Sequence, residues 1–198
     1  MFIQEQQLEG QHVRLEPLNA GHIEALAEAV RDGEGWALWY ASVPHPDDMA
    51  AYVERAMEEA SRGHLAYAVR HLASGDIVGT TRFYAVDAAN RRAMIGYTWY
   101  AERVRGTAVN AECKLLMLSN LFEASRAVAC EFRTHFFNRA SRAAIEALGA
   151  KQDGILRAHQ ILSDGSLRDT VVYSIIESEW PAVRANLQAK LARFASHS

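Results

Sequence analysis

The spacing of apolar and polar residues changes along the chain, and each change marks an expected element. Residues 12–18 alternate at every second position, which is typical of a half-buried strand. Over residues 20–31 the apolar positions recur every three or four residues, as on one face of a helix. The stretch 32–46, rich in glycine, proline and aromatic residues, interrupts this pattern. A second helix is expected over 47–62, because two aspartates suit its start and Gly63 follows its end.

Three runs of strand-forming residues follow, and the turn signals between them predict antiparallel hairpins. After these runs the pattern changes to an alternation of helix and strand, which indicates a βαβ unit. The three runs are 65–71, 76–86 and 92–100; they are followed by a helix over 110–125, a strand over 127–136, a helix over 138–150, a last hairpin over 154–162 and 168–176, and a terminal helix over 179–194.

The predicted order of elements is β α α β β β α β α β β α. It combines an antiparallel front half with a back half that contains a βαβ unit, so the expected class is α+β around one mixed sheet. The sequence contains no internal repeat, low-complexity tract or Pro/Ser-rich linker. Residues 1–198 are therefore expected to form one domain.

Composition narrows the class of protein. The 198 residues are 49% hydrophobic and carry a net charge of −3, with no basic cluster that would attract nucleic acid. The N-terminal residues lack a signal-peptide pattern, and no stretch reaches the roughly 18 apolar residues of a membrane helix. Cys113 and Cys130 offer neither metal-ligand spacing nor a disulfide framework. We therefore expect a cytoplasmic protein without a metal site, in which both thiols are buried as small apolar groups.

Several catalytic motifs are missing from the sequence. There is no Walker GxxxxGK[ST] loop, no GxGxxG after a strand, no HExxH, no CxxC and no GxSxG. These absences argue against nucleotide hydrolases, nicotinamide enzymes, zinc peptidases and serine hydrolases.

The segment Arg103–Ala108, RVRGTA, connects the strand that ends near Tyr100 to the helix expected from about Asn110. A helix N-terminus offers unpaired N–H groups and about half a positive charge. Gly106 and the small Ala108 allow the loop amides to turn toward one point, so the segment suits a pyrophosphate. An ordinary strand-to-helix turn with Gly106 at positive φ explains the same spacing, and the loop alone leaves both interpretations open.

The pattern R-x-x-G-x-A of this loop, placed between a strand and a helix, resembles the [QR]-x-x-G-x-[GA] acyl-CoA signature of the GNAT acetyltransferases. Four segments, 95–100, 106–116, 131–150 and 156–175, are similar to the RimJ/RimL-like branch, which is related to the ribosomal-protein N-acetyltransferases. The resemblance extends over roughly residues 8–182. It implies the GNAT fold, a mixed and mostly antiparallel sheet whose two central parallel strands splay apart, flanked by helices. It also implies acetyl-CoA as the acyl donor.

According to the resemblance, acetyl-CoA binds along the splayed strand and the loop. Backbone groups of residues 98–100 would pair with the pantetheine arm as an added strand would, and one amide would face the thioester oxygen. The amides of residues 104–109 would hold the pyrophosphate. The implied coenzyme residues are Thr98, Trp99, Tyr100, Arg103, Val104, Arg105, Gly106, Thr107, Ala108, Val109, Asn110, Asn138, Ser141 and Arg142.

Three of these residues also have ordinary structural interpretations. Asn110 and Asn138 each stand where an asparagine would cap a helix. Arg142 either reaches the coenzyme phosphates or is a solvated arginine on a helix face. In the resemblance, Asn138 also bonds the pantetheine amide. Ser141 is the general acid for the departing thiolate, which needs little help because a thiol pKa is about 8.5.

The general base is the open question on the acceptor side. Met94 occupies the position where many members of the family carry a glutamate. The amine must lose a proton before it attacks, so another residue or a water relay has to accept that proton. His159 lies in the hairpin where the resemblance places the acceptor pocket, and an imidazole exchanges protons near neutral pH. A structural histidine remains an alternative there, and His135, Glu131 and Asp169 are further candidates.

The aromatic residues of the stretch 32–46 are candidates for one wall of that pocket, although they could instead cover the edge of the core or form a subunit contact. The expected substrate-pocket residues are Trp36, Trp39, Tyr40, His135 and His159.

The expected function is transfer of the acetyl group of acetyl-CoA to a primary amine, on a protein N-terminus or a small molecule, by direct attack in a ternary complex. Neither nucleic acid nor a membrane is an expected partner, and a homodimer through the terminal helix or the aromatic stretch is a further hypothesis. One alternative is a non-catalytic acyl-CoA-binding sensor or scaffold. Another is a nucleotide-binding protein using the same loop, which the lack of a lysine there disfavours.

Overall fold

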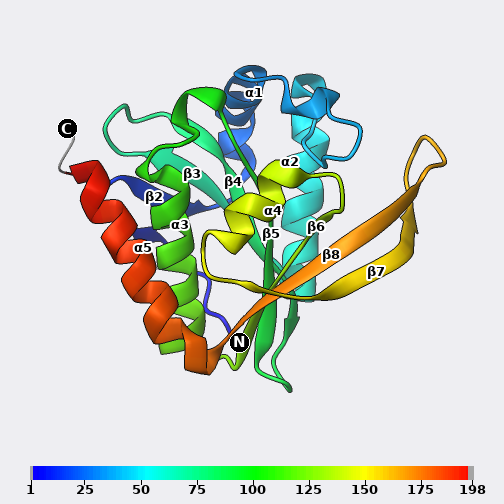
Figure 1. Cartoon of the computed structure of the whole chain (residues 1–198). Coiled ribbons are helices and arrows are strands. Elements are labelled where there is room, and N and C mark those ends of the chain that lie inside the picture. The colour runs from blue at the N-terminus through cyan, green and yellow to red at the C-terminus, as the bar shows by residue number, and fades with distance from the viewer. Residues whose placement is uncertain (1, 196–198) are drawn as a thin grey trace.

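Eight strands form a single sheet in the order β1-β2-β3-β4-β5-β6-β8-β7 (Figure 1). The structure is a computed structural model that describes residues 2–195. All neighbouring pairs are antiparallel except β5 and β6, which confirms the predicted mixed α+β class. The strands are β1 (Leu8–Glu9), β2 (Val13–Pro17), β3 (Leu65–His71), β4 (Ile77–Asp87), β5 (Arg92–Tyr100), β6 (Ala129–His135), β7 (Lys151–Ile161) and β8 (Leu167–Ile176).

Helices cover both faces of this sheet. Tyr52 of α2 contacts Thr80 at 3.1 Å, whereas Lys114 of α3 contacts the next residue, Thr81, at 3.2 Å. Successive side chains of a strand point to opposite faces, so α2 and α3 lie on opposite sides of β4. Helix α5 packs beside α3 (Figure 1). The helices are α1 (Ile23–Arg31), α2 (Met49–Glu58), α3 (Ala108–Ser119), α4 (Arg139–Glu146) and α5 (Trp180–Ala195), with short helical turns η1 (Ala20–His22), η2 (Gly35–Ala37), η3 (Pro46–Asp48), η4 (Glu59–Arg62), η5 (Glu102–Val104), η6 (Asn120–Ala124) and η7 (Glu177–Glu179).

The predicted order of elements is confirmed, with the two-residue strand β1 in addition. Several boundaries differ from the predictions by two to four residues; the helix expected over 138–150, for example, ends at Glu146. Strand β7 begins at Lys151 rather than 154, because a register shift against β8 between Gln152 and Gly154 carries the pairing past the glycine. The helix expected over 110–125 begins earlier, at Ala108, and its last turn is a π-helical turn.

Strands β5 and β6 splay apart, as expected. Their parallel register runs only from Arg92–Met94 against Ala129–Glu131, while β5 continues to Tyr100 and β6 to His135. A bulge in β5 bends it further: two residues, Tyr97 and Thr98, stand opposite Thr81 of β4, and Tyr97 has a φ of 51°. The sheet therefore opens into a gap in front of the β5–α3 loop.

A buried carboxylate fixes α3 beneath this gap. Glu112 accepts hydrogen bonds from the backbone amides of Gln11 (2.9 Å) and His12 (2.6 Å), in the turn between β1 and β2, and from that of Val13 (2.7 Å), the first residue of β2. Three amides on one carboxylate replace its lost hydration, so burial of the charge is compensated and the helix is tied to the N-terminal hairpin.

The predicted state of the cysteines is confirmed, since Cys113 and Cys130 are both buried and unpaired. Burial raises the pKa of the Cys113 thiol to about 11, so it behaves as a small apolar side chain. Within residues 2–195, no helix is long and apolar enough to span a bilayer.

Candidate active site

The loop after β5 makes a sharp turn before α3 begins. Gly106 has a φ of 75°, and Thr107 returns to extended backbone. The Thr107 hydroxyl donates to the Val104 carbonyl at 2.7 Å and accepts from the Val109 amide at 3.3 Å. Thr107 is therefore the N-cap of α3. The interpretation of Asn110 as a cap of this helix was wrong, because the left-handed glycine turns the chain early enough for the threonine to cap.

Three amides at this turn are free to bind an anion. Among residues 2–195, the N–H groups of Gly106, Thr107 and Ala108 have no protein acceptor. The amides of Val104 and Arg105 instead close the turn η5, on the carbonyls of Ala101 (3.3 Å) and Glu102 (2.9 Å). The set predicted over residues 104–109 thus narrows to three donors at the positive end of α3, which is an arrangement that suits a phosphate.

The two arginines of the loop have different surroundings. The Arg103 guanidinium pairs with Asp32 at 2.8 Å and approaches Asp76 at 3.6 Å, so it braces the loop from the end of α1. Hydrogen bonding from Arg103 lowers the pKa of the Asp32 carboxyl. Arg105 donates from Nε to the Tyr100 carbonyl at 3.2 Å, and in the described chain it has no carboxylate within 4.0 Å.

The side chains at the end of β5 are fixed in the protein interior. The Thr98 hydroxyl lies 2.8 Å from that of Thr81 and 3.0 Å from Nζ of Lys114. Trp99 is buried, and its backbone and that of Tyr100 pair with β4 along one edge of the strand. The other edge faces the gap left by β6, which is where an extended ligand would add as a strand.

Lys114 was missed by the sequence analysis. It is buried on α3, and desolvation lowers its pKa to about 8. The available signal was its position on the helix, because it falls between Ala111 and Leu118 on the apolar stripe that faces the sheet.

Asn138 caps α4, which is the structural interpretation given to it above. Its side-chain oxygen accepts from the Ser141 amide at 3.0 Å and caps the helix. The Ser141 hydroxyl has no protein partner in residues 2–195, so it is available to a ligand. Arg142 donates from Nε to the Tyr173 hydroxyl at 3.0 Å, and that hydroxyl donates to Glu146 at 2.7 Å. The Arg142 guanidinium is therefore already held within the protein.

A small cavity of about 240 Å³ lies between the β5 bulge and the β7–β8 hairpin. His159 contributes to it, which places this predicted residue in a pocket, and its Nδ1 lies 3.1 Å from the Thr170 hydroxyl. The cavity is lined by Ser42, Tyr84, Gly96, Tyr97, Arg133, His159, Gln160, Arg168 and Thr170.

The aromatic residues do not line this cavity. Trp39 and Tyr40 pack instead on His135 at the end of β6, with ring centroids 5.0 and 6.0 Å away, and Trp36 packs on His45. Within the described residues, the Nε2 atom of His135 is buried without a partner, while its Nδ1 accepts from the Phe137 amide at 3.0 Å. Desolvation lowers the pKa of His135, which favours the neutral ring.

The other candidates for a general base are occupied. Glu131 is bound by Arg92 at 2.9 Å and Arg133 at 2.5 Å. Asp169 is bound by Arg157 at 2.6 Å. Hydrogen bonds from the Ala158 amide and from Arg157 lower the pKa of the Asp169 carboxyl, which makes it a weak base. Both oxygens of Glu131 already accept hydrogen bonds from arginine. His159 is the exposed candidate that lies in the cavity itself.

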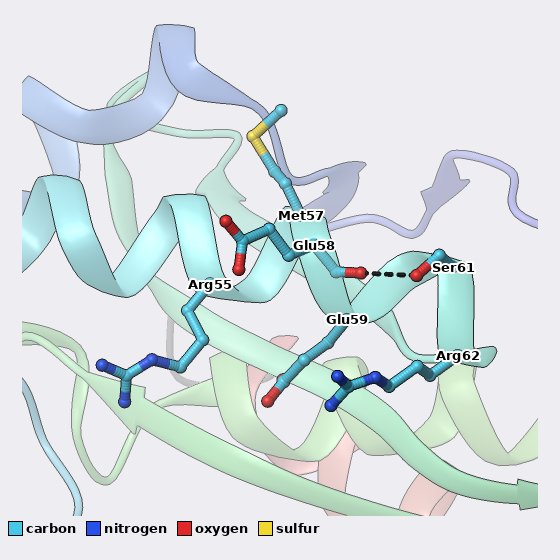
Figure 2. A pocket seen from close by; sticks show the side chains of 6 residues that line it. All are labelled: Arg55, Met57, Glu58, Glu59, Ser61 and Arg62. Atoms are coloured by element: carbon cyan, nitrogen blue, oxygen red, sulfur yellow. Dashed lines mark hydrogen bonds between the residues drawn. The ribbon is translucent and has the colours of Figure 1, made fainter.

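A larger hollow, of about 610 Å³, lies along the end of α2 and η4 (Figure 2). Its walls come from a single stretch of chain, and the hydrogen bond from the Ser61 hydroxyl to the Glu58 carbonyl closes that stretch. None of its lining residues belongs to β5, β6 or α3, so it is separate from the candidate site. They are Arg55, Met57, Glu58, Glu59, Ser61 and Arg62.

Comparison with known proteins adds an independent finding. A family model described as an acetyltransferase (GNAT) domain matches residues 12–151. YdaF of Bacillus subtilis (strain 168), which carries the provisional name ribosomal N-acetyltransferase, is 25% identical over 177 residues, covering 86% of this chain and 94% of its own. The crystal structure of a provisionally named acetyltransferase from T. thermophilus is 32% identical, with a TM-score of 0.84 over 96% of this chain and 100% of that one. The Microcin C7 self immunity acetyltransferase MccE, solved with acetyl-CoA and AMP, shares the fold at 18% identity, with a TM-score of 0.73 over 84% of this chain and 93% of that one.

Proposed function

Because the chain belongs to the GNAT acetyltransferase family, we propose that it transfers the acetyl group of acetyl-CoA to a primary amine. The acceptor is a protein N-terminus or a small amine, and the amine attacks directly while both substrates are bound. The observation that carries the proposal is the continuity of the gap beside β5 with the three free amides of Gly106, Thr107 and Ala108. A backbone edge followed by an anion-binding turn fits an arm that ends in a pyrophosphate.

Acetyl transfer requires three functions of the protein: stabilising the oxyanion, accepting the proton of the ammonium, and protonating or solvating the thiolate. A backbone amide at the free edge of residues 98–100 would donate to the thioester oxygen as negative charge develops there. His159, or water in the same cavity, would take the proton that the ammonium loses. The amine nitrogen then bonds to the acetyl carbon, the carbon–sulfur bond breaks, and the Ser141 hydroxyl protonates or solvates the departing thiolate.

The acceptor side supports an amine of modest size. The cavity of about 240 Å³ is large enough for the head group of an amine. Among residues 2–195 no cluster of three His, Cys, Asp or Glu side chains could hold a metal ion, and the mechanism needs none. A cytoplasmic location and a homodimer stay predictions.

The test is release of coenzyme A thiol from acetyl-CoA across a panel of small amines and short peptides. Amine-dependent release, with the acetylated product identified by mass spectrometry, is the expected result. Tight binding of coenzyme A without turnover on any amine would instead favour a non-catalytic acyl-CoA sensor or scaffold. Stronger thermal stabilisation by ATP than by coenzyme A would favour a nucleotide-binding protein.

Replacing Ser141 with alanine should lower kcat about tenfold and leave the KM for acetyl-CoA nearly unchanged. The thiolate is a tolerable leaving group, so its protonation contributes only part of the rate. The Asn138 cap is unaffected, because it binds the backbone amide of residue 141 rather than the side chain. Steady-state kinetics measure the effect, and a rate below about one thousandth of the wild type would contradict so limited a role for the hydroxyl.

A further inference from the structure

Arg168 is a half-buried cation without a counterion in the acceptor cavity. Its Nε donates to the Thr170 hydroxyl at 3.1 Å, and in the described chain that is its only hydrogen bond. No carboxylate of residues 2–195 lies within 4.0 Å of its guanidinium. Desolvation lowers the pKa of Arg168, which reflects the cost of holding this charge away from water.

The neighbouring arginines differ in this respect. Arg133, in the same cavity, is paired with Glu131 at 2.5 Å. Arg157, on the opposite strand of the hairpin, is paired with Asp169 at 2.6 Å. A guanidinium taken partly out of water is normally balanced by an anion, and its flat fork matches the two oxygens of a carboxylate or phosphate. Of the two arginines that line the cavity, Arg168 is the one whose terminal guanidinium nitrogens are free to bind an anion within residues 2–195.

The Arg168 guanidinium is held beside His159, the candidate base, by a shared hydrogen-bond partner. The Thr170 hydroxyl binds both Arg168 Nε and His159 Nδ1, each at 3.1 Å. Tyr84 and Tyr97 also line the cavity, and the ring of Tyr97 packs under the Arg82 guanidinium at 4.1 Å. One hydroxyl thus fixes the spacing between a charge that binds an anion and a ring that can accept a proton.

We propose that Arg168 binds an oxyanion, a carboxylate or a phosphate, carried by the amine acceptor a few bonds from its nitrogen. This rests on the proposed function, because it names the substrate class of that same site. The two terminal nitrogens of the guanidinium hold the oxyanion and thereby place the amine beside His159. Acceptors that carry such an anion are then preferred over neutral amines of the same size.

Matched pairs of acceptors test this preference and distinguish the two anions. The pairs are alanine with alaninamide, O-phosphoethanolamine with 2-methoxyethylamine, and the peptide amides Ala-Asp-Ala and Ala-Asn-Ala. Values of kcat/KM are compared per neutral amine, because the anion also changes the amine pKa. In at least one pair the anionic acceptor should be favoured by about tenfold to a hundredfold, the range for a hydrogen bond to a charged group.

Variants then assign the preference to this residue. Arg168→Gln should remove the tenfold to hundredfold preference, because kcat/KM falls by that factor more for the anionic acceptor than for its neutral partner, while the Kd of coenzyme A stays within about twofold of the wild-type value. Arg168→Lys should restore part of it, since the charge returns without the fork. Arg157→Gln removes the same charge from the same hairpin outside the cavity and should change nothing. Equal use of both members of every pair, or equal loss on both in Arg168→Gln, would overturn the proposal.

A binding experiment keeps this proposal separate from the proposed function. The Arg168 Nε–H resonance, assigned by its absence from Arg168→Gln, should shift on titration with propionate or methyl phosphate. A shift without turnover on any amine would leave the oxyanion subsite standing while the acetyltransferase proposal fails. Turnover without either a shift or a charge preference would remove the subsite alone.

Discussion

Replacing Gly106 with valine should raise the Kd of coenzyme A at least about a hundredfold and leave the protein folded. Gly106 has a φ of 75°, where a β-branched residue is strained, and relief of that strain would rotate the amides of residues 106–108 away from their common point. Loss of two charge-assisted hydrogen bonds of about 1.5–3 kcal/mol each accounts for a hundredfold change or more. Isothermal titration with coenzyme A measures it.

The matched control is Gly75→Val. Gly75 has a φ of 77°, and like Gly106 it has no atom within 4 Å of where a Cβ would stand. It lies in the β3–β4 turn, so the substitution brings the same backbone strain to a different place. Both variants should lose about 1–2 kcal/mol of folding stability, but only Gly106→Val should lose affinity. Equal affinities of the two variants for coenzyme A would contradict the assignment of these amides to the pyrophosphate.

The strands that could be placed accurately are those with local signals at both ends. Strands β3 (65–71) and β5 (92–100) were predicted to the residue, because alternation or β-rich composition runs up to a turn on each side. From the sequence, only Asn110 was considered as a cap of α3, whereas the cap is Thr107. The backbone of Gly106 places the cap there, and φ is not readable from a sequence.

The parts of the site that could not be predicted depend on partners far apart in the chain. Arg168 is notable because no carboxylate reaches it, whereas Asp169 beside it turns to Arg157. Sequence spacing cannot show which of two adjacent charged residues is paired across a hairpin. In the aromatic stretch 32–46, Trp39 packs on His135 whereas Ser42 lines the cavity, and residue type alone could not show which of these side chains faces it.

Replacing Lys114 with methionine should stabilise the protein at pH 7 by up to about 3 kcal/mol. Burial lowers the pKa of Lys114 to about 8 from its ordinary value of 10.5, and within residues 2–195 its ammonium donates hydrogen bonds only to the hydroxyls of Thr81 and Thr98. Each unit of pKa corresponds to about 1.4 kcal/mol, which gives this upper limit. The two hydroxyls lie 2.8 Å apart and can bond to each other after the substitution, so no buried polar group is left unpaired.

The pH dependence has a definite sign. Between pH 8 and 10.5 the unfolded chain retains a proton that Lys114 has released in the folded protein. The unfolded state therefore binds more protons, and this residue's contribution to folding stability rises with pH across that window. Below pH 8 both states are protonated and the full cost of burying the charge applies. The advantage of Lys114→Met should accordingly be constant from pH 6 to 7, decline above pH 8 and approach zero above about pH 10.5.

Urea unfolding of wild type and variant at each pH gives that difference, and taking the difference removes the titration of all other groups. Lys190→Met is the control, because Lys190 is exposed on α5, so this substitution removes a lysine without removing a buried charge. A variant that is less stable than wild type at pH 7 would mean that the charged ammonium is stabilised in the interior. Lys114 would then contribute positive charge beneath Thr98, at the strand edge proposed to bind the thioester, and the same variant should weaken binding of acetyl-CoA.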